Sequence, residues 1–421
     1  DWAPLLPDLL RPQGYRSYHS GKWHIDGQVL AGGFDRSYLM LDQGRFFSPK
    51  RHQLDDKPLP AVMRDSGYYA TTAIADRAIE FLRQHHAEHA QQPFCLYLAF
   101  TAPHFPLHAL AEDIERYRER YRAGWDKVRA TRWARLQALG IVHDVPLSDV
   151  ERDVGPPYHF PEALESLGPD EVNRPIPWEE LTPSQREFKA AKMAIHAAMI
   201  DRMDRETGRV LEQLRSMGAW DNPWICSLSD NGARAETMVR DHGHDPAAPP
   251  GSAVSYLCLG PGWSTAANTP FRRHKTWVHE GGIATPFIVH WPKGIAARDE
   301  LRRTPGHVVD IVPTVLELAG ADPRSLPEGT PARHGASIVP TFAEDAAPPR
   351  TFWWLHEENR ALRVGDWKLV AAKDEPWTLF DLSTDRCETR DLSGRHPERV
   401  ADLAAQWEAE WERIQRLARG E

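Results

Sequence analysis

The chain has 421 residues, more than one hydrophobic core usually serves, so its length predicts a large domain with a smaller one attached. Its net charge of −9 argues against a nucleic-acid partner, because nucleic-acid surfaces need concentrated Lys and Arg. No apolar stretch approaches the roughly 20 residues of a transmembrane helix, so we expect no membrane-spanning segment and no membrane partner.

Helical patterns alternate with short apolar runs along the first three quarters of the chain. The pattern predicts, in chain order, a helix over Leu5–Arg11, a strand over Arg16–Ser20, a helix over Tyr69–His85, a strand over Phe94–Phe100, a surface helix pair over 110–140, a long surface excursion over 144–184, a helix over Pro183–Met217, a buried strand from Trp224, a loop over 241–274, a strand from Pro286 and a helix over Val308–Leu318. This alternation predicts an α/β fold in which a mostly parallel sheet is covered by helices on both faces.

The composition shifts across Pro340–Arg350, which predicts a boundary between a domain of residues 1–345 and a C-terminal subdomain of residues 346–421. Three short strands with hairpin-like spacing follow, over Arg360–Val364, Trp367–Ala371 and Trp377–Leu382, and then a helix over Pro397–Leu417. We therefore expect a small antiparallel α+β subdomain at this end of the chain.

Polar residues follow the apolar strand that begins at Trp224. Asp230, Asn231 and Gly232 end that strand, at the edge of an α/β sheet where ligands bind. The carboxylate and amide oxygens of Asp230 and Asn231 are hard ligands that suit Ca²⁺ or Mg²⁺, although Asp-Asn-Gly alone is an ordinary turn sequence.

Three further segments place a cation or an imidazole in or beside a turn. They are Gly21-Lys22-Trp23-His24, Ala102-Pro103-His104 and Lys275-Thr276-Trp277-Val278-His279-Glu280-Gly281-Gly282. Lys22 and His24 are two residues apart, so on an extended stretch they point to the same side. His104 lies between two prolines that hold it rigidly at the end of a strand.

In this order, the four segments resemble the signatures of the type I sulfatases, which are formylglycine-dependent arylsulfatases and alkylsulfatases of the alkaline phosphatase superfamily. The resemblance extends from about Leu6 to Leu392. It implies an alkaline-phosphatase-like fold and a sulfuric ester hydrolase that cleaves aryl, alkyl or carbohydrate sulfate esters by a metal-assisted covalent mechanism.

The resemblance also implies residue roles. Lys22 would contact both the sulfate and the nucleophile, and His24 would take the proton of the nucleophile when the sulfated intermediate breaks down. His104 and Lys275 would bind sulfate and protonate the leaving group. Asp230 and Asn231 would hold Ca²⁺, with Mg²⁺ as an alternative, and His356 would reach the leaving group from the C-terminal subdomain.

One departure from the family is large. Its nucleophile, a formylglycine, is made from Cys or Ser within Cys/Ser-x-Pro-x-Arg, and none of the four Cys begins that pattern. The nearest match, Thr182-Pro183-Ser184-Gln185-Arg186, lacks the nucleophile. The Asp-Asp pair of the family's first strand is missing too. We expect an inactive fragment of a sulfatase, with the nucleophile and its formylglycine-generating maturation system linked to an upstream segment.

Two alternatives stay open. A phosphonate monoester or phosphodiester hydrolase of the same superfamily would share the fold and metal site, and a non-catalytic chain could bind anions or glycans without turnover. The cysteines and the first residues do not fix the compartment, although a periplasmic or secreted location is favoured over a cytoplasmic one.

Overall fold

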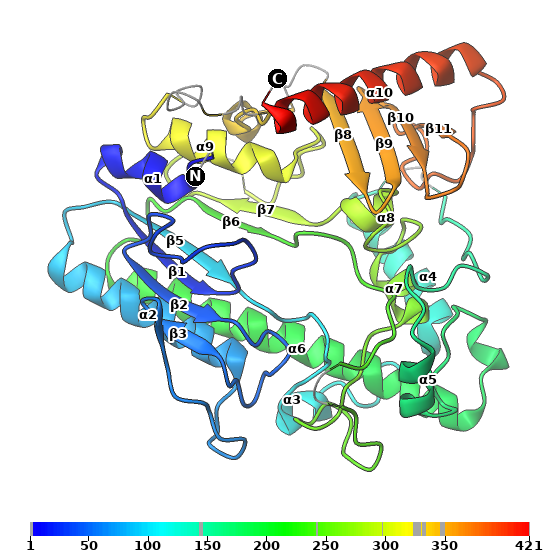
Figure 1. Cartoon of the computed structure of the whole chain (residues 1–421), viewed down its shortest axis with the longest axis horizontal. Helices are drawn as coiled ribbons and strands as arrows, with labels where there is room; N and C mark the ends of the chain where they lie inside the picture. Colours follow the sequence, from blue (N-terminus) through cyan, green and yellow to red (C-terminus); the bar gives the residue numbers. More distant parts are fainter. Residues whose placement is uncertain are drawn as a thin grey trace.

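A computed structural model describes residues 3–142, 146–240, 243–296, 298–322, 330, 334–345 and 350–420. Its largest sheet has five strands in the order β4-β3-β2-β1-β5 (Figure 1). The strands are β1 (Arg16–Gly21), β2 (Arg36–Met40), β3 (His52–Leu54), β4 (Lys57–Pro58) and β5 (Phe94–Ala99). β1 pairs in parallel with both β2 and β5, whereas β3 and β4 are antiparallel additions at the far edge. The predicted α/β fold, with its mostly parallel sheet, is confirmed.

Helices lie on both sides of this sheet (Figure 1). α2 (Ala70–Glu88) and α6 (Pro183–Ser216) pack against each other on one side, and the short α1 (Leu6–Leu10) and α9 (Ile311–Leu318) lie on the other. Thr182 caps the start of α6: its hydroxyl accepts a hydrogen bond from the Gln185 amide, and the Gln185 side chain accepts one from the Thr182 amide. The stretch that looked most like a nucleophile motif is therefore a helix-capping box.

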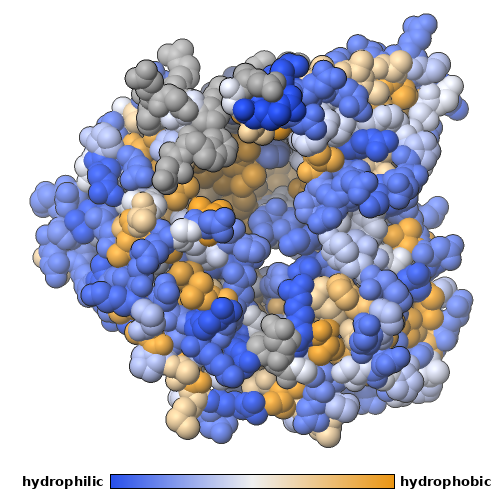
Figure 2. All heavy atoms as spheres, in the orientation of Figure 1, coloured by the Kyte–Doolittle hydropathy of each residue, from blue (hydrophilic) through white to orange (hydrophobic). Residues whose placement is uncertain are grey.

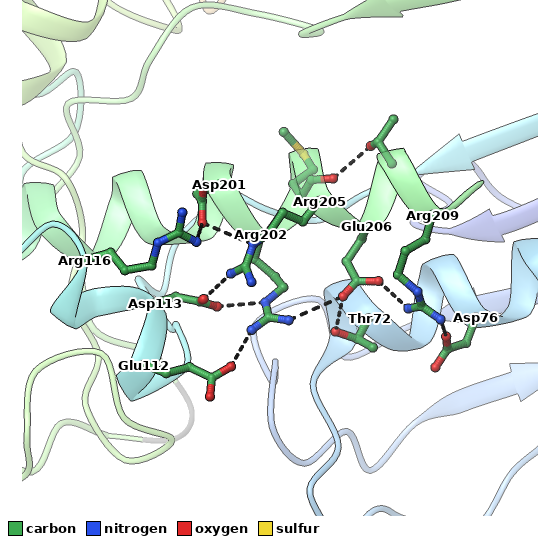
Figure 3. A network of polar contacts seen from close by, with 12 residues as sticks. Thr72, Asp76, Glu112, Asp113, Arg116, Asp201, Arg202, Arg205, Glu206 and Arg209 are labelled. Atoms are coloured by element: carbon green, nitrogen blue, oxygen red, sulfur yellow. Dashed lines mark hydrogen bonds and ion pairs between the residues drawn. The ribbon is translucent and has the colours of Figure 1, made fainter. Parts of the chain in front are cut away.

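Ion pairs hold α6 against α2 and against α3 (Ala111–Glu115) (Figure 3). Arg202 donates to the buried carboxylate of Asp113 at 2.7 Å, and Arg205 pairs with the same carboxylate. On the α2 side, the Thr72 hydroxyl donates to Glu206 at 2.9 Å, and Arg209 donates to Asp76 at 2.6 Å. These contacts fix the position of the long helix under the sheet.

β6 (Ile225–Leu228) and β7 (Phe287–His290) form a separate antiparallel pair. The prediction that the strand from Trp224 is buried was wrong, since the exposed fractions are 39% for Leu228 and, on β7, 64% for Ile288. β5 is an edge strand of the five-stranded sheet and β6 is an edge strand of the pair, and both line one cavity of about 2450 Å³. Side chains of α6 and α9 line it as well, and Figure 2 shows hydrophobic residues within a hollow of the surface.

The C-terminal region forms a four-stranded antiparallel sheet in the order β11-β10-β9-β8. Its strands are β8 (Thr351–His356), β9 (Asn359–Val364), β10 (Trp367–Ala371) and β11 (Thr378–Asp381), and α10 (Pro397–Arg419) packs on them. The three expected strands and the helix are present, and β8 is an additional strand. The proposed boundary at 345/346 stays a prediction, and residues 346–349 lie outside the described residues.

The remaining helices join these layers. They are α4 (Gly124–Ala138), α5 (Pro161–Leu167), α7 (Pro261–Ala267), α8 (Glu280–Ile283) and the 3₁₀ turns Arg11–Gln13, Trp178–Glu180, Val308–Asp310 and Val339–Phe342. The expected surface excursion over 144–184 is partly wrong, because Trp178 is buried against Trp125 and Trp263, with ring centroids 4.8 and 5.7 Å away. Burying an indole is favourable wherever a partner surface exists. No helix of the described residues is both long and apolar enough to cross a membrane.

Candidate active site

Six of the seven residues predicted for the site line the cavity between β5 and β6. They are Lys22, His24, His104, Asp230, Asn231 and Lys275. The seventh, His356, does not line the cavity; its Nδ1 donates to the carbonyl oxygen of Thr276 at 3.1 Å, next to Lys275. The four motifs thus meet at one place, although 253 residues separate Lys22 from Lys275 (275 − 22).

The end of β1 fixes Lys22. Gly21 pairs with Ala99 of β5 and has a φ of +126°, and a Cβ at this position would lie only 1.9 Å from the Ala99 carbonyl oxygen. The Lys22 amide donates to that same oxygen at 2.8 Å. Only glycine tolerates this approach and this φ, so Gly21 directs the chain from the sheet into the cavity wall. His24 follows as an exposed residue of the same wall.

The Asp-Asn-Gly turn and the Lys275 segment are joined through their backbones. The Gly232 amide donates to the Gly282 carbonyl at 2.9 Å, and the Lys275 amide donates to the Ala233 carbonyl at 3.0 Å. A Cβ on Gly232 would lie 1.9 Å from the carbonyl oxygen of Gly281. The absence of a side chain at Gly232 therefore permits the close backbone approach of the two motifs. This approach brings Asp230 and Lys275 to the same cavity.

Asn268 supports this junction and was not predicted from the sequence. Its Oδ1 accepts from the Ala233 amide at 2.8 Å, and its Nδ2 donates to the Arg273 carbonyl at 3.1 Å. An amide side chain in a region expected to be a loop carries no signal of this role, because the role depends on two distant backbone segments.

His104 is neutral in this structure. Its Nδ1 donates to the Phe105 carbonyl at 2.8 Å, and its Nε2 faces Nη1 of Arg234 at 2.5 Å, where the guanidinium can only donate. Burial, together with the positive charges of Arg234, Lys22 and Lys275, lowers the pKa of His104 to about 4. In the free chain, the ring therefore accepts at Nε2 and carries no proton there to give to a leaving group.

Arg234 and Glu236 belong to the site, and sequence reasoning missed both. Glu236 is 1% exposed, and its carboxylate accepts from Nε and Nη2 of Arg234 at 3.0 and 2.9 Å. Burial and the charge of Arg234 also lower the pKa of Lys275, while Asp230 and Glu236 act in the opposite direction. The signal was present in part, because Arg234 lies two residues after Gly232, as a cation beside a turn.

The donor types of Asp230 and Asn231 fit a hard divalent cation, but their number does not. Ca²⁺ needs about six to eight oxygens, and within the described part of the chain no group of three His, Cys, Asp or Glu side chains is placed to hold a metal. Asp230 is exposed at the cavity wall. These two residues could contribute two of the oxygen ligands of a metal site.

The arrangement suits a tetrahedral anion. Lys22, Arg234 and Lys275 all line the cavity, and their positive charges all act on His104. Ammonium groups bind oxyanion oxygens as compact point charges, and a guanidinium does so as a planar fork. A neutral imidazole at the same place can accept a proton once negative charge enters.

Comparisons with known proteins agree with this chemistry. A family model described as Sulfatase matches residues 1–321. An arylsulfatase of Klebsiella aerogenes is 32% identical over 355 residues, covering 77% of this chain and 69% of that protein. An uncharacterized sulfatase of Schizosaccharomyces pombe is 29% identical over 452 residues, covering 97% of this chain and 76% of that protein.

A solved structure described as BT4656 in complex with its substrate D-glucosamine-2-N,6-O-disulfate has a TM-score of 0.62 and 17% identity, over 97% of this chain and 82% of that one. At this identity the likeness shows the fold. Sulfatases are hydrolases that act on sulfate esters, and the family model spans both the sheet and the cavity motifs. The chain belongs to the sulfatase family.

Proposed function

We propose that this chain forms the sulfate-binding part of a sulfuric ester hydrolase, with Lys22, His104 and Lys275 around the sulfate group. The proposal rests on the proximity of these three residues, since all line the cavity and the charges of both lysines act on His104. A sulfate monoester is an anion, and its oxygens need compact cationic donors in a site partly withdrawn from water. His24 lies in the same wall, where it could act on a nucleophile bound beside Lys22.

Protonation of the leaving group by His104 has to follow substrate binding. In the free chain, Nε2 of His104 accepts from Arg234 and the pKa of the ring is about 4, so the ring is neutral near pH 7. An anionic ester beside it favours the protonated ring, because opposite charges stabilise one another. The general-acid role is therefore a property of the complex.

We further propose that these 421 residues bind the ester without hydrolysing it. A covalent route needs an activated nucleophile, and no Cys here begins the motif from which formylglycine is made. Within the described residues, β5 and β6 each have one edge without a strand partner, which supports the proposal, since a strand placed between them would reach the edge where Lys22 and Asp230 lie. Such a segment would bring the formylglycine, made by its maturation system, and further ligands for Ca²⁺ or Mg²⁺.

The proposed substrate is an aryl, alkyl or carbohydrate sulfate ester. One relative is named an arylsulfatase, and the substrate named for one structural neighbour is a sulfated glucosamine. The choice between them therefore rests on binding measurements.

Titration calorimetry with 4-nitrophenyl sulfate and 4-nitrophenyl phosphate tests the proposal on the chain as it stands. We expect the sulfate to bind, and Lys275→Ala to weaken its binding at least tenfold, because a charge-assisted contact is lost. Lys293→Ala is the control, since Lys293 is exposed and does not line the cavity. Tighter binding of the phosphate would favour the phosphonate monoester or phosphodiester alternative, and equal effects of the two Lys variants would contradict the proposed site.

A further inference from the structure

Arg234 lines the cavity beside the predicted residues, and the four sequence motifs give it no role. Its backbone is fixed on both sides. The amide of Ala233 donates to Asn268, the carbonyl of Ala233 accepts from Lys275, and Ala235 is fully buried. The side chain of Arg234 is 19% exposed, so it is held in the wall while still open to the cavity.

Glu236 fixes the plane of the Arg234 guanidinium. Its buried carboxylate accepts two hydrogen bonds, at 3.0 Å from Nε and 2.9 Å from Nη2. The guanidinium also lies over the ring of Phe105, 4.1 Å from the centroid. A bidentate pair combined with ring stacking leaves one orientation of the fork, so the remaining nitrogen, Nη1, points at His104.

A purely structural Arg–Glu pair would not need this third contact. Nη1 donates to Nε2 of His104, which is a neutral acceptor. Oxygens of an anion are stronger acceptors for a guanidinium than a neutral imidazole nitrogen. An anion that enters beside Lys22 and Lys275 would therefore compete successfully for this donor.

We propose that Arg234 is a further substrate-binding residue, whose Nη1 transfers its hydrogen bond from His104 to an oxygen of the anionic ester and so frees Nε2 of His104 for a proton. This inference rests on the proposed function, because it assumes a sulfate ester in the cavity, and it adds a binding residue and an order of events. The proton comes from solvent, and no covalent bond of the ester changes in this step.

The electrostatics of the site are consistent with that order. Burial comes first among the causes that hold the pKa of His104 near 4, and Arg234 is the largest of the three cationic contributions. Withdrawing the guanidinium donor and adding a negative oxygen both favour protonation of the ring. Binding of the ester at pH 5–6 should therefore be coupled to proton uptake by His104.

The test uses the full chain and 4-nitrophenyl sulfate as the probe. Arg234→Gln removes the donor, and Arg240→Gln is the matched control, because Arg240 also lies over Phe105, at 5.4 Å, without lining the cavity. We expect Arg234→Gln to weaken binding about 10- to 100-fold, as expected for one charge-assisted hydrogen bond, and Arg240→Gln to change it less than twofold.

A second measurement distinguishes a direct effect of Arg234 on His104 from a general loss of folding. Nitrogen-15 NMR of His104 should show the Nδ1-protonated neutral ring in the parent, and in Arg234→Gln the ring should titrate at a higher pH. If the single variant fails to fold because Glu236 is left unpaired, the double variant Arg234→Gln/Glu236→Gln removes both buried charges and serves for both measurements.

The outcomes are distinguishable. Unchanged affinity in Arg234→Gln, with Lys275→Ala impaired, overturns the role of Arg234 and leaves the proposed function standing. An unchanged titration of His104 in the Arg234 variants overturns the link between the two residues. A parent chain that binds no 4-nitrophenyl sulfate overturns the proposed function together with this inference.

Discussion

The C-terminal sheet and the facing edges of β5 and β6 are built from similar apolar strands but reach opposite degrees of burial. In the C-terminal sheet, Leu362, Leu369 and Leu379 are at most 1% exposed, because α10 and neighbouring strands cover them. At the cavity, Tyr97 of β5 is 51% exposed and Leu228 of β6 is 39% exposed. An apolar strand sequence therefore predicts a strand, whereas burial depends on which elements lie beside it. The residues of the candidate site lie beside the exposed strands β5 and β6.

Among the substitutions considered, replacement of Lys368 in the C-terminal sheet should destabilise the protein most. Its ammonium is fully buried and pairs with Glu280 at 2.8 Å and with Glu388 at 2.7 Å, and this contact lowers the pKa of Glu280 to about 2 against the opposing effect of burial. Lys368→Met would remove the buried ammonium from both carboxylates, leaving Glu280 with the more distant Arg386 at 3.2 Å. We expect the free energy of unfolding to fall by about 3–5 kcal/mol in urea denaturation.

Lys373→Met is the matched control, because Lys373 is 54% exposed and pairs with an exposed Glu358. It should change the free energy of unfolding by less than about 0.5 kcal/mol. Equal losses in the two variants would mean that the buried ion pair does not hold the C-terminal sheet to the Glu280 turn.

The same substitution, Leu to Ala, can be made in both regions, and the two losses of stability can be compared directly. Leu369→Ala, in the covered sheet, should cost about 2–5 kcal/mol, whereas Leu228→Ala, at the open edge, should cost less than about 1 kcal/mol. Urea denaturation measures both. A loss at Leu228 as large as that at Leu369 would show that β6 is covered in solution, for example by a second copy of the chain.

The glycine junction of the site gives a smaller expected effect. Gly232→Ala forces a Cβ against the Gly281 carbonyl and should destabilise the protein by about 1–3 kcal/mol. Gly208→Ala, within α6, meets no atom within 4 Å and should be neutral or stabilising by up to about 1 kcal/mol. A tolerated Gly232→Ala variant would show that the two motifs do not need their close backbone approach.

A pH titration of His196, which lies on α6, tests whether water reaches this side of the cavity. His196 lines the cavity and is 8% exposed, and burial lowers its pKa from 6.5 to about 4. As the pH falls, the unfolded chain therefore binds a proton at His196 before the folded chain does. The stability that the buried, neutral His196 contributes is complete above pH 6.5 and is lost as the pH falls through 4. Carbon-13 NMR of His196 should show titration near 4; titration near 6.5 would mean that water reaches the ring.

Local patterns account for much of the fold, and contacts between distant segments account for what was missed. The helix predicted over Pro183–Met217 is α6, Pro183–Ser216, because its period and capping box are local features. β8 was not predicted, since its run Phe352-Trp353-Trp354-Leu355 lacks the alternation that distinguishes a strand.

The same distinction applies to the site. Six cavity residues could be predicted because each lies in a short motif. The contact of Arg234 with His104 joins residues 130 positions apart, and no local pattern encodes it. The neutral state of His104 follows from that contact and from burial, so it could not be predicted from the sequence either.

We propose that these 421 residues bind a sulfate ester in the cavity without cleaving it. The most direct measurement mixes the chain with an equimolar amount of 4-nitrophenyl sulfate, after calorimetry has established saturation, and follows nitrophenolate release with time. We predict bound ester that requires Lys275 and no release above the buffer control. A burst of nitrophenolate approaching one equivalent per chain would contradict the claim, because it would require a nucleophile within these residues.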